Sequence, residues 1–259
     1  MSVDVGTRAL VRMGVRAEPR RRLFCMPYAG GGVAPFRLWH RSLPDDVEVV
    51  AVQLPGREAR LRETPLSSIS AMVESILPEI ADATDVPYAI FGHSMGSLIA
   101  YELTVQLQQA GGRSPDRLFV SGRRAPDEID TRPDLHALPT STFLVELQRR
   151  YGAIPAPVLA EPELLDLLVP VVRADIRAVE SYRAPAQPVR IAAPVHVYGG
   201  ESDEHPLPSQ LSGWSRCALD SVRVRVFPGN HFYLNEQREA LTADIDAQWP
   251  SRVVEVSRG

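Results

Sequence analysis

Short apolar runs alternate along the chain with longer segments in which apolar residues recur at helical spacing. The apolar runs are rich in β-branched residues and nearly continuous, as strands buried on both faces of a sheet tend to be. They cover residues 23–26, 47–53, 88–91, 118–121, 195–198 and 222–227. Helical patterns lie between them, for example at residues 66–82 and 97–110. This alternation predicts an α/β fold with a mostly parallel central sheet and helices on both faces.

One long region, residues 126–184, interrupts the alternation because it holds helical patterns and no strand pattern. The helical patterns cover residues 140–151, 161–168 and 170–182. Pro155 and Pro157 separate the first pattern from the other two. An insertion at the carboxyl ends of parallel strands would lie over an active site as a helical lid. The alternative is an ordinary helical crossover, but such connections are typically much shorter.

The composition suits a single globular domain. With 259 residues, 44% of them hydrophobic, the chain can build one large core and carry an insertion. We expect residues 21–259 to form this domain and residues 1–20 to form a mobile, arginine-containing arm. The formal net charge of -4 argues against a general nucleic-acid binder.

The chain shows no sign of a membrane or metal partner. No apolar stretch is long enough to span a membrane, and none before Leu23 has the length of a secretory signal. We therefore expect a cytoplasmic protein. The two cysteines, Cys25 and Cys217, form neither a disulfide framework nor a metal-ligand spacing. We expect no metal and no bound cofactor.

The strongest candidate for chemistry is the segment Gly92-His93-Ser94-Met95-Gly96. It stands between an apolar run and a helical pattern, and strand, G-x-S-x-G and helix in this order are typical of a nucleophile elbow. Glycines on both sides of the serine let the strand and the helix approach closely. The alternative is a glycine-rich turn with an incidental serine, and the flanking elements favour Ser94 as a nucleophile.

A serine hydroxyl needs a general base, and the base needs an orienting carboxylate. In the hydrolases that use this elbow, the acid and then the histidine follow the serine along the chain. Four of the six histidines fit this order or position badly, because they precede Ser94, lie in the predicted lid or lie within a strand: His40, His93, His136 and His196. His231, in a loop directly after a predicted strand, is our candidate base, and His205 is the alternative.

The carboxylate is expected in the glycine-rich turn after residues 195–198. Asp203 is our candidate for hydrogen bonding to the His231 ring, with Glu201 and Glu204 as alternatives. Any of the three could instead be a solvated loop carboxylate.

An oxyanion hole needs two backbone donors. The N–H of Met95, directly after the nucleophile, is one candidate. The second is the N–H of Ala29, in the loop Pro27-Tyr28-Ala29-Gly30-Gly31-Gly32, where glycines let the backbone approach a reacting carbonyl. This loop lacks the lysine of a phosphate-binding loop. Together these residues predict acyl transfer through an acyl-enzyme on Ser94.

Several segments, in order along the chain, resemble type II thioesterases, the stand-alone editing hydrolases of modular polyketide and nonribosomal peptide synthesis. They are residues 27–31, 53–58, 92–96, 118–126 and 227–232, together with parts of the predicted lid. The most discriminating segment is Gln53-Leu54-Pro55-Gly56-Arg57-Glu58, which general esterases of this fold do not usually carry.

The resemblance implies an α/β-hydrolase fold with a helical lid. It also implies hydrolysis of aberrant or stalled acyl groups from the phosphopantetheine arm of a carrier protein. The family's nucleophile, acid and base fall on Ser94, Asp203 and His231, and its oxyanion donors on Ala29 and Met95.

The expected partner is an acyl or peptidyl carrier protein of a synthase, and we expect the chain to be a monomer. Carrier proteins are usually acidic, so arginines near the entrance would favour docking, and four lie in the predicted lid: Arg149, Arg150, Arg173 and Arg177. The alternative is that these arginines form a solvated helix face. Two other functions stay open: a medium-chain fatty acyl or chain-releasing thioesterase, and a non-catalytic binding protein with the same fold.

Overall fold

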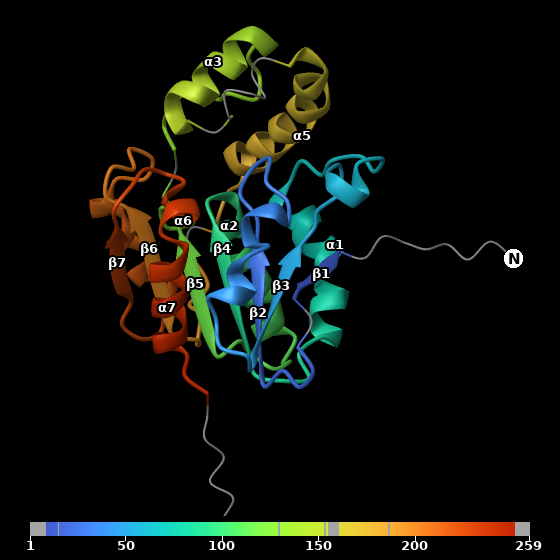
Figure 1. Ribbon diagram of the computed structural model, residues 1–259. Helices are drawn as coiled ribbons and strands as arrows, with labels where there is room; N and C mark the ends of the chain where they lie inside the picture. The colour runs from blue at the N-terminus through green and yellow to red at the C-terminus, as the bar shows by residue number, and fades with distance from the viewer. Residues whose placement is uncertain are drawn as a thin grey trace, which may run out of the picture.

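A seven-stranded sheet forms the middle of the molecule (Figure 1). The computed structural model describes residues 9–14, 16–128, 130–152, 154, 161–185 and 187–251. The strand order is β1-β3-β2-β4-β5-β6-β7, and every neighbouring pair is parallel except β1 with β3. The strands are β1 (Leu10–Met13), β2 (Arg21–Met26), β3 (Val47–Val52), β4 (Tyr88–His93), β5 (Arg117–Ser121), β6 (Val195–Gly200) and β7 (Arg223–Phe227). The predicted α/β fold with a mostly parallel sheet is confirmed.

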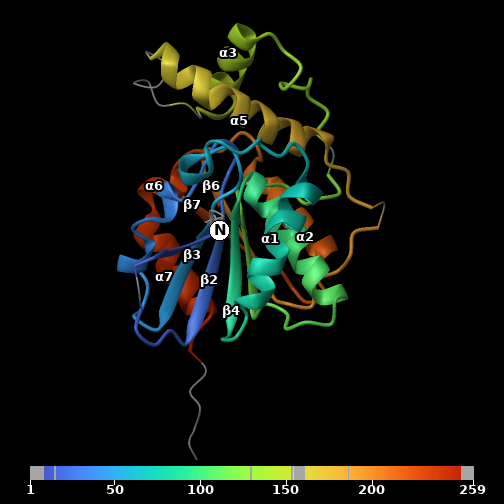
Figure 2. The ribbon, with the colours of Figure 1, turned by 90° about the vertical axis from the view of Figure 1, so that its right-hand side faces the viewer.

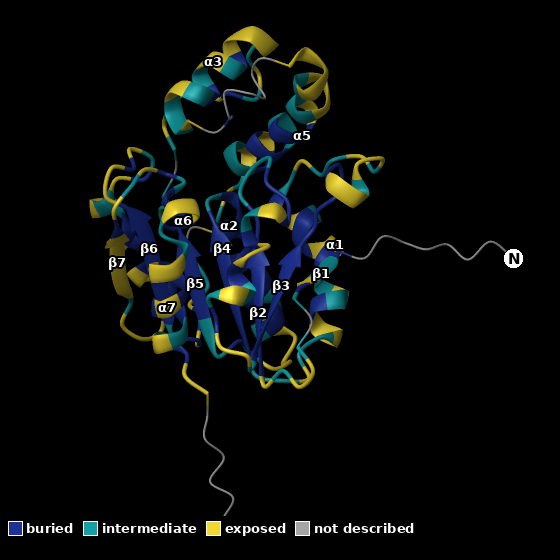
Figure 3. Cartoon of the chain, viewed as in Figure 1, coloured by how far each residue is buried: buried dark blue, intermediate teal, exposed yellow. Residues whose placement is uncertain are grey.

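Helices cover both faces of this sheet (Figure 2). One face carries α1 (Ile69–Asp82) and α2 (Met95–Gln109), and the other carries α6 (Tyr233–Glu236) and α7 (Arg238–Gln248). Within β2 the side chains alternate between the two faces: Phe24 and Met26 join one hydrophobic cluster, and Leu23 and Cys25 join the other. Both clusters are covered, and the inner strands are buried along their length except at Arg117, the first residue of β5 (Figure 3).

The first strand, β1, corrects the sequence analysis, which places residues 1–20 in an arm. Leu10–Met13 pair antiparallel with β3, with Leu10 opposite Val52 and Met13 opposite Val49. This edge strand is short and only its last residue is buried, so its apolar signal is too weak to stand out. Residues 1–8 of the predicted arm lie outside the described residues.

The described part of the region between β5 and β6 holds two long helices, α3 (Thr140–Tyr151) and α5 (Pro162–Ser181), which lie across the carboxyl ends of the strands (Figures 1 and 2). The sequence analysis divides the second helix at Pro170, but the structure has one continuous helix with this proline inside it. A proline costs one backbone hydrogen bond. Val171, Val172 and Ile176, which follow the proline, are nevertheless buried, and Val172 and Ile176 pack with Phe143 and Leu147 of α3. Pro155 and Pro157 lie outside the described residues.

Among the described residues, short 3-10 helices lie at Ala34–Phe36, Trp39–Arg41 and Glu58–Arg60, and a longer one covers Pro208–Cys217. Among the helices that the structure describes, none is both long enough and apolar enough to cross a membrane. The loops after β2, β4, β6 and β7 all emerge at the same edge of the sheet, under α3 and α5, because these strands are parallel.

Candidate active site

Ser94 occupies a sharp turn between β4 and α2. Its backbone has φ 54° and ψ -114°, a conformation that residues with a side chain rarely adopt. A Cβ added to Gly92 would lie 2.7 Å from Ser97 N, and one added to Gly96 would lie 2.7 Å from the Met26 carbonyl carbon. The strand and the helix are thus in backbone contact, which is the physical reason for both glycines. The Ser94 side chain caps no N–H of α2, so its hydroxyl is not used by its own helix.

His231 and Asp203 form a buried pair beside this turn. The His231 Nδ1 and the Asp203 Oδ2 are 2.8 Å apart, and the side chains are 5% and 2% exposed. Because a carboxylate can only accept, Nδ1 carries the proton and the neutral ring keeps Nε2 as an acceptor. The other Asp203 oxygen accepts from the backbone N–H of His205 at 2.8 Å. The alternatives Glu201 and Glu204 are exposed.

One cavity contains both Ser94 and His231. Its wall also includes Ala29, from the loop after β2, and the alternative base His205. The rest of the lining joins apolar and aromatic side chains with arginines: Tyr28, Arg123, Arg124, Arg132, Leu147, Tyr151, Ile176, Val179, Pro206 and Phe232. No carboxylate lines this cavity in the described part of the chain. The wall is therefore partly apolar, partly cationic and formed in part by the helices of the 126–184 region.

The two candidate oxyanion donors lie on different elements. Met95 is the first residue of α2, where helical N–H groups have no intrahelical acceptor and the helix dipole favours negative charge. Ala29 lies in the cavity wall and belongs to the loop after β2. The structure thus gathers all five residues that the sequence analysis selected at one edge of the sheet.

Three further polar side chains, His93, Ser121 and Tyr233, are linked to one another beside His231. From the sequence, His93 is expected only to be a packing residue. His93 is fully buried, its Nδ1 is 2.8 Å from the Ser121 hydroxyl, and its ring centroid is 5.1 Å from that of His231. The Ser121 hydroxyl is also 2.6 Å from that of Tyr233. Burial, reinforced by the neighbouring His231, holds the pKa of His93 well below its ordinary value. His93 is therefore a neutral support for the His231 ring.

Arg123 was part of a family-like segment but received no role from the sequence. Its Nε is buried without a hydrogen-bond partner among the described residues, and burial lowers its pKa. Arg132, by contrast, is paired with Asp130 and donates to the Tyr151 hydroxyl at 3.0 Å. Arg123, Arg132 and Tyr151 also line a second cavity, so the two cavities adjoin. Nε of Arg123 is thus a buried donor without a partner, in a side chain that lines both cavities.

The four arginines that the sequence placed in the lid differ in their surroundings. Arg173 donates to the carbonyls of His136 and Leu138 and lies over the Phe143 ring, and the side chain of Arg150 is 7% exposed. Arg177 is exposed, and Arg149 is exposed beside Glu146. Of these four, Arg149 and Arg177 are therefore the exposed ones, and Arg149 is already paired with Glu146.

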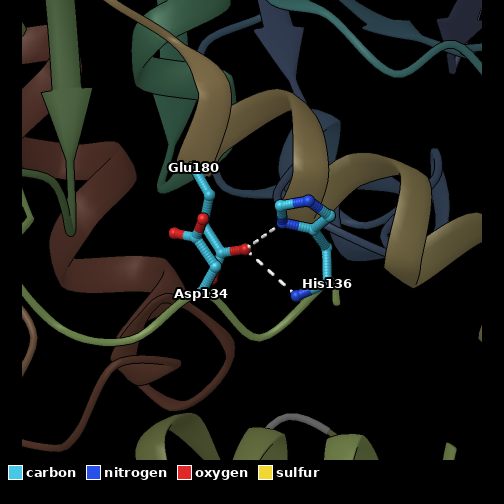
Figure 4. A group of neighbouring side chains, drawn as sticks. All are labelled: Asp134, His136 and Glu180. Atoms are coloured by element: carbon cyan, nitrogen blue, oxygen red, sulfur yellow. Dashed lines mark hydrogen bonds and ion pairs between the residues drawn. The ribbon is translucent and has the colours of Figure 1, made fainter. Parts of the chain in front are cut away.

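One group of side chains has the composition of a metal site, namely Asp134, His136 and Glu180 (Figure 4). Glu180, on α5, already accepts from the backbone N–H groups of Leu135 and His136, at 2.7 and 3.1 Å. The His136 Nδ1 is 2.7 Å from the same carboxylate. The carboxylate therefore has a structural task, which is to fasten the loop before α3 to α5.

Comparison with known proteins places the chain among thioesterases of natural-product pathways. Residues 21–249 match the family described as "Thioesterase domain". Gramicidin S biosynthesis protein GrsT of Aneurinibacillus migulanus is 37% identical over 228 residues, which cover 88% of each chain. Thioesterase PikA5 of Streptomyces venezuelae is 34% identical over 231 residues, 86% of this chain and 79% of that one.

A solved structure gives the same result. The RedJ thioesterase of the prodiginine biosynthetic pathway in Streptomyces coelicolor superposes with a TM-score of 0.81 at 37% identity. The alignment covers 90% of this chain and 87% of RedJ. Sequence and fold therefore agree over nearly the whole chain.

Proposed function

Because the chain belongs to the thioesterase domain family and is a thioester hydrolase, we propose that it removes acyl groups from the phosphopantetheine arm of carrier proteins. The carrier proteins would be those of a polyketide or nonribosomal peptide synthase, and the acyl groups would be aberrant or stalled ones. The proposal is supported most by one observation. A strained, uncapped Ser94 shares a cavity with His231, whose ring is held by Asp203.

In the proposed acylation step, the Ser94 hydroxyl attacks the thioester carbonyl carbon and passes its proton to Nε2 of His231. Asp203 stabilises the imidazolium that forms and does not itself take the proton. The carbonyl oxygen becomes an oxyanion, which the N–H groups of Ala29 and Met95 stabilise. When the intermediate collapses, the carbon–sulfur bond breaks, and the pantetheine thiolate leaves with the proton from His231.

Deacylation repeats these steps with water. His231, again neutral, takes a proton from a water molecule that attacks the acyl carbon on Ser94. The same two N–H groups hold the second oxyanion. The bond between the Ser94 oxygen and the acyl carbon then breaks, the serine regains its proton from His231, and a free carboxylic acid is released.

The cavity walls suit a substrate with an apolar acyl chain and a polar arm. Leu147, Ile176 and Phe232 supply apolar area in the wall of the cavity that holds Ser94, and arginines such as Arg124 supply its polar part. A carrier protein with acidic side chains would dock on the outside of the lid, where Arg149 and Arg177 are exposed.

The test is a panel of acyl-carrier proteins that differ in chain length and α-branching, with kcat/KM measured for each. We expect free acid to form with wild-type protein and not with Ser94→Ala, which loses the nucleophile. Mass spectrometry of the wild type, trapped during turnover, should show an acyl group on Ser94.

Three results would contradict the proposal. If wild type hydrolyses none of these thioesters above the background of Ser94→Ala, hydrolysis at Ser94 is excluded and the alternative of a binding protein with this fold is favoured. A preference for glycerol oxygen esters over acyl-pantetheine thioesters would exclude a carrier-linked substrate. High kcat/KM only for medium-chain fatty acyl groups would favour fatty acid release over synthase editing.

A further inference from the structure

The segment Gln53-Leu54-Pro55-Gly56-Arg57-Glu58 follows β3, and the mechanism above gives it no task. None of its residues lines the cavity that holds Ser94 in the part of the chain that the structure describes. Its charged side chains instead contact the loop after β2, which carries the proposed oxyanion donor Ala29. These contacts fix the position of the loop after β2.

Arg57 joins this loop to the lid helix α5 through a buried ion pair. Its Nη1 and Nη2 donate to the two carboxylate oxygens of Asp175 at 2.8 and 2.9 Å, and Nη1 also donates to the Gly31 carbonyl at 2.9 Å. Arg57 is 5% exposed and Asp175 is 0% exposed. A desolvated bidentate pair fixes geometry, because moving one partner leaves the other charge buried and unpaired.

Asp175 also holds the loop directly. Its Oδ2 accepts from the Gly30 N–H at 2.7 Å, while Arg57 holds the carbonyl of the next residue. Gly30 has φ +76°, and a Cβ there would lie 2.6 Å from Cγ2 of Val172. Helix α5 therefore packs directly against the backbone of Gly30, the residue that follows Ala29.

Glu58 fixes the far end of the same loop. Its carboxylate accepts from the N–H groups of Val33 at 3.0 Å and Ala34 at 3.4 Å, and from Nε2 of Gln53 at 3.1 Å. Glu58 has φ 48°, a strained value for a residue with a side chain. Such strain persists only where the surroundings fix the residue, as these hydrogen bonds do.

We propose that Arg57 and Asp175 are positioning residues that couple the lid to the oxyanion hole, by holding the loop so that the Ala29 N–H points at the developing oxyanion. The inference rests on the proposed serine mechanism. A displacement of α5 would take Asp175 away from both Gly30 and Arg57, and the donor would lose its orientation. The lid then controls the chemical step as well as access to Ser94.

The test uses Asp175→Asn, the charge-free pair Arg57→Gln/Asp175→Asn, and Arg57→Lys. The substrate is a small acyl thioester without a carrier protein, so that docking plays no part. The second ligand is a trifluoromethyl ketone analogue of that thioester. Its carbonyl carbon bonds to the Ser94 oxygen, the serine proton passes to His231, and the resulting oxyanion occupies the hole.

For Asp175→Asn and for the double variant, we expect kcat to fall about 10- to 100-fold, because small misplacements of catalytic groups lower rates by such factors. The Ki of the ketone should rise by the same factor, while KM stays within about threefold, because only the oxyanion senses the hole. Arg57→Lys keeps the positive charge but cannot form the bidentate pair with the Asp175 carboxylate, so it should show the same changes in kcat and Ki. It is the variant to measure if the other two do not fold.

The matched control is Glu48→Gln. It breaks another buried pair, because Oε2 of Glu48 accepts from Nε of Arg22 at 2.6 Å, at the amino ends of β2 and β3 and far from Ser94. It should lower thermal stability and leave kcat and Ki unchanged. The proposal is overturned if folded variants of Arg57 and Asp175 keep wild-type kcat and Ki, or if Glu48→Gln shifts Ki equally.

The ketone also separates this proposal from the proposed function. Fluorine NMR detects the ketone adduct without turnover. If wild type forms the adduct but hydrolyses no carrier-bound thioester, the substrate assignment is wrong, and the Ki values still decide whether Arg57 and Asp175 orient the donor. If wild type forms no adduct at all, the positioning proposal fails with the serine mechanism.

Discussion

Asp203 engages both of its carboxylate oxygens, and this decides how the His231 ring is held. One oxygen meets Nδ1 of His231 at 2.8 Å and the other accepts from the N–H of His205 at 2.8 Å. The carboxylate cannot rotate without losing one of the two bonds. Because the pair is buried, water does not replace a lost bond, and the orientation of the ring depends on this one side chain.

Asp203→Asn should therefore lower kcat by about 10³- to 10⁴-fold, because an amide can present its NH₂ group to the ring and favour the wrong tautomer. The protein should remain folded, since the amide fills the same space. Steady-state kinetics on a small acyl thioester measure the loss. Glu201→Gln and Glu204→Gln are the matched controls, and we expect them to stay within about twofold of wild type because both side chains are exposed. A large loss in either control, with Asp203→Asn active, would transfer the acid role to that residue.

The sequence marks Ser94 and His231 by stronger signals than Asp203, which it selects with Glu201 and Glu204 as alternatives. The serine is marked by its two glycines and the histidine by its place after a strand, and both signals are local. Which carboxylate of a turn points inward depends on the path of the loop, and here the turn is fixed by contacts with the loop after β7, such as Ser202 N to Gly229 O at 2.9 Å. Because that contact joins residues far apart in the sequence, a local pattern does not reveal it.

His196 should make stability depend on pH. Burial lowers its pKa to about 4, with Arg117 and Arg223 adding to the effect and Asp244 opposing it. The unfolded chain then binds a proton from about pH 6.5 downward while the folded chain does not, so stability is lost as the pH falls from about 6.5 to about 4. Between pH 7.5 and pH 5 this site should cost about 2 kcal/mol.

His196→Gln should remove that part of the pH dependence. Urea unfolding at pH 7.5 and at pH 5 would give the free energy of unfolding for both proteins. The loss between the two pH values should be smaller in the variant by about 2 kcal/mol. Identical losses in wild type and variant would show that His196 titrates normally in the folded protein.

At the scale of elements, the junction of β4 with α2 has no room for side chains. Gly92 lies against the backbone of Gly96 and Ser97, and Gly96 lies against Met26 and Pro27 at the end of β2. A single added methyl group would meet backbone atoms, which cannot turn away as a side chain can. The elbow, the first turn of α2 and the loop after β2 would have to shift together.

Gly96→Ala should therefore cost about 1–3 kcal/mol of stability, the usual range for overpacking, and most of the activity. Gly112→Ala is the matched control, because its Cβ would have only the Leu107 carbonyl oxygen nearby, at 3.7 Å. Thermal unfolding and kcat/KM of the two variants would be compared. If both variants behave alike, close packing at the elbow is not what requires the glycine.

The elements that the sequence predicted well are those whose signal is self-contained. The inner strands are continuous apolar runs, α1 has a clear helical periodicity, and α2 follows directly on the glycine-flanked serine. The division of α5 at Pro170 was wrong because a proline removes only one backbone hydrogen bond, and the residues directly after it, Val171 and Val172, are buried within the continuous helix. β1 was missed for the opposite reason, since most of its stability comes from pairing with β3 and little from its own side chains.

Across the whole molecule, exposed arginines lie at both ends of the sheet, but only one of these ends holds Ser94. The end that holds Ser94 is covered by α3 and α5, with Arg149 and Arg177 exposed on them. Arg20 is equally exposed but precedes β2, at the amino ends of the strands. An acidic carrier protein that delivers an acyl group to Ser94 must approach from the first end.

Arg177→Glu should consequently raise KM for an acyl-carrier protein about three- to tenfold at low salt and leave kcat unchanged, because a charge at the rim of an interface acts mainly on association. The effect should shrink at about 0.5 M salt, where screening is strong. A small acyl thioester should be hydrolysed as by wild type, since it needs no docking surface. Arg20→Glu changes the net charge equally and should leave KM for the carrier unaltered. If the two variants raise KM to the same extent, net charge rather than a surface on the lid governs the encounter, and docking at Arg177 is excluded.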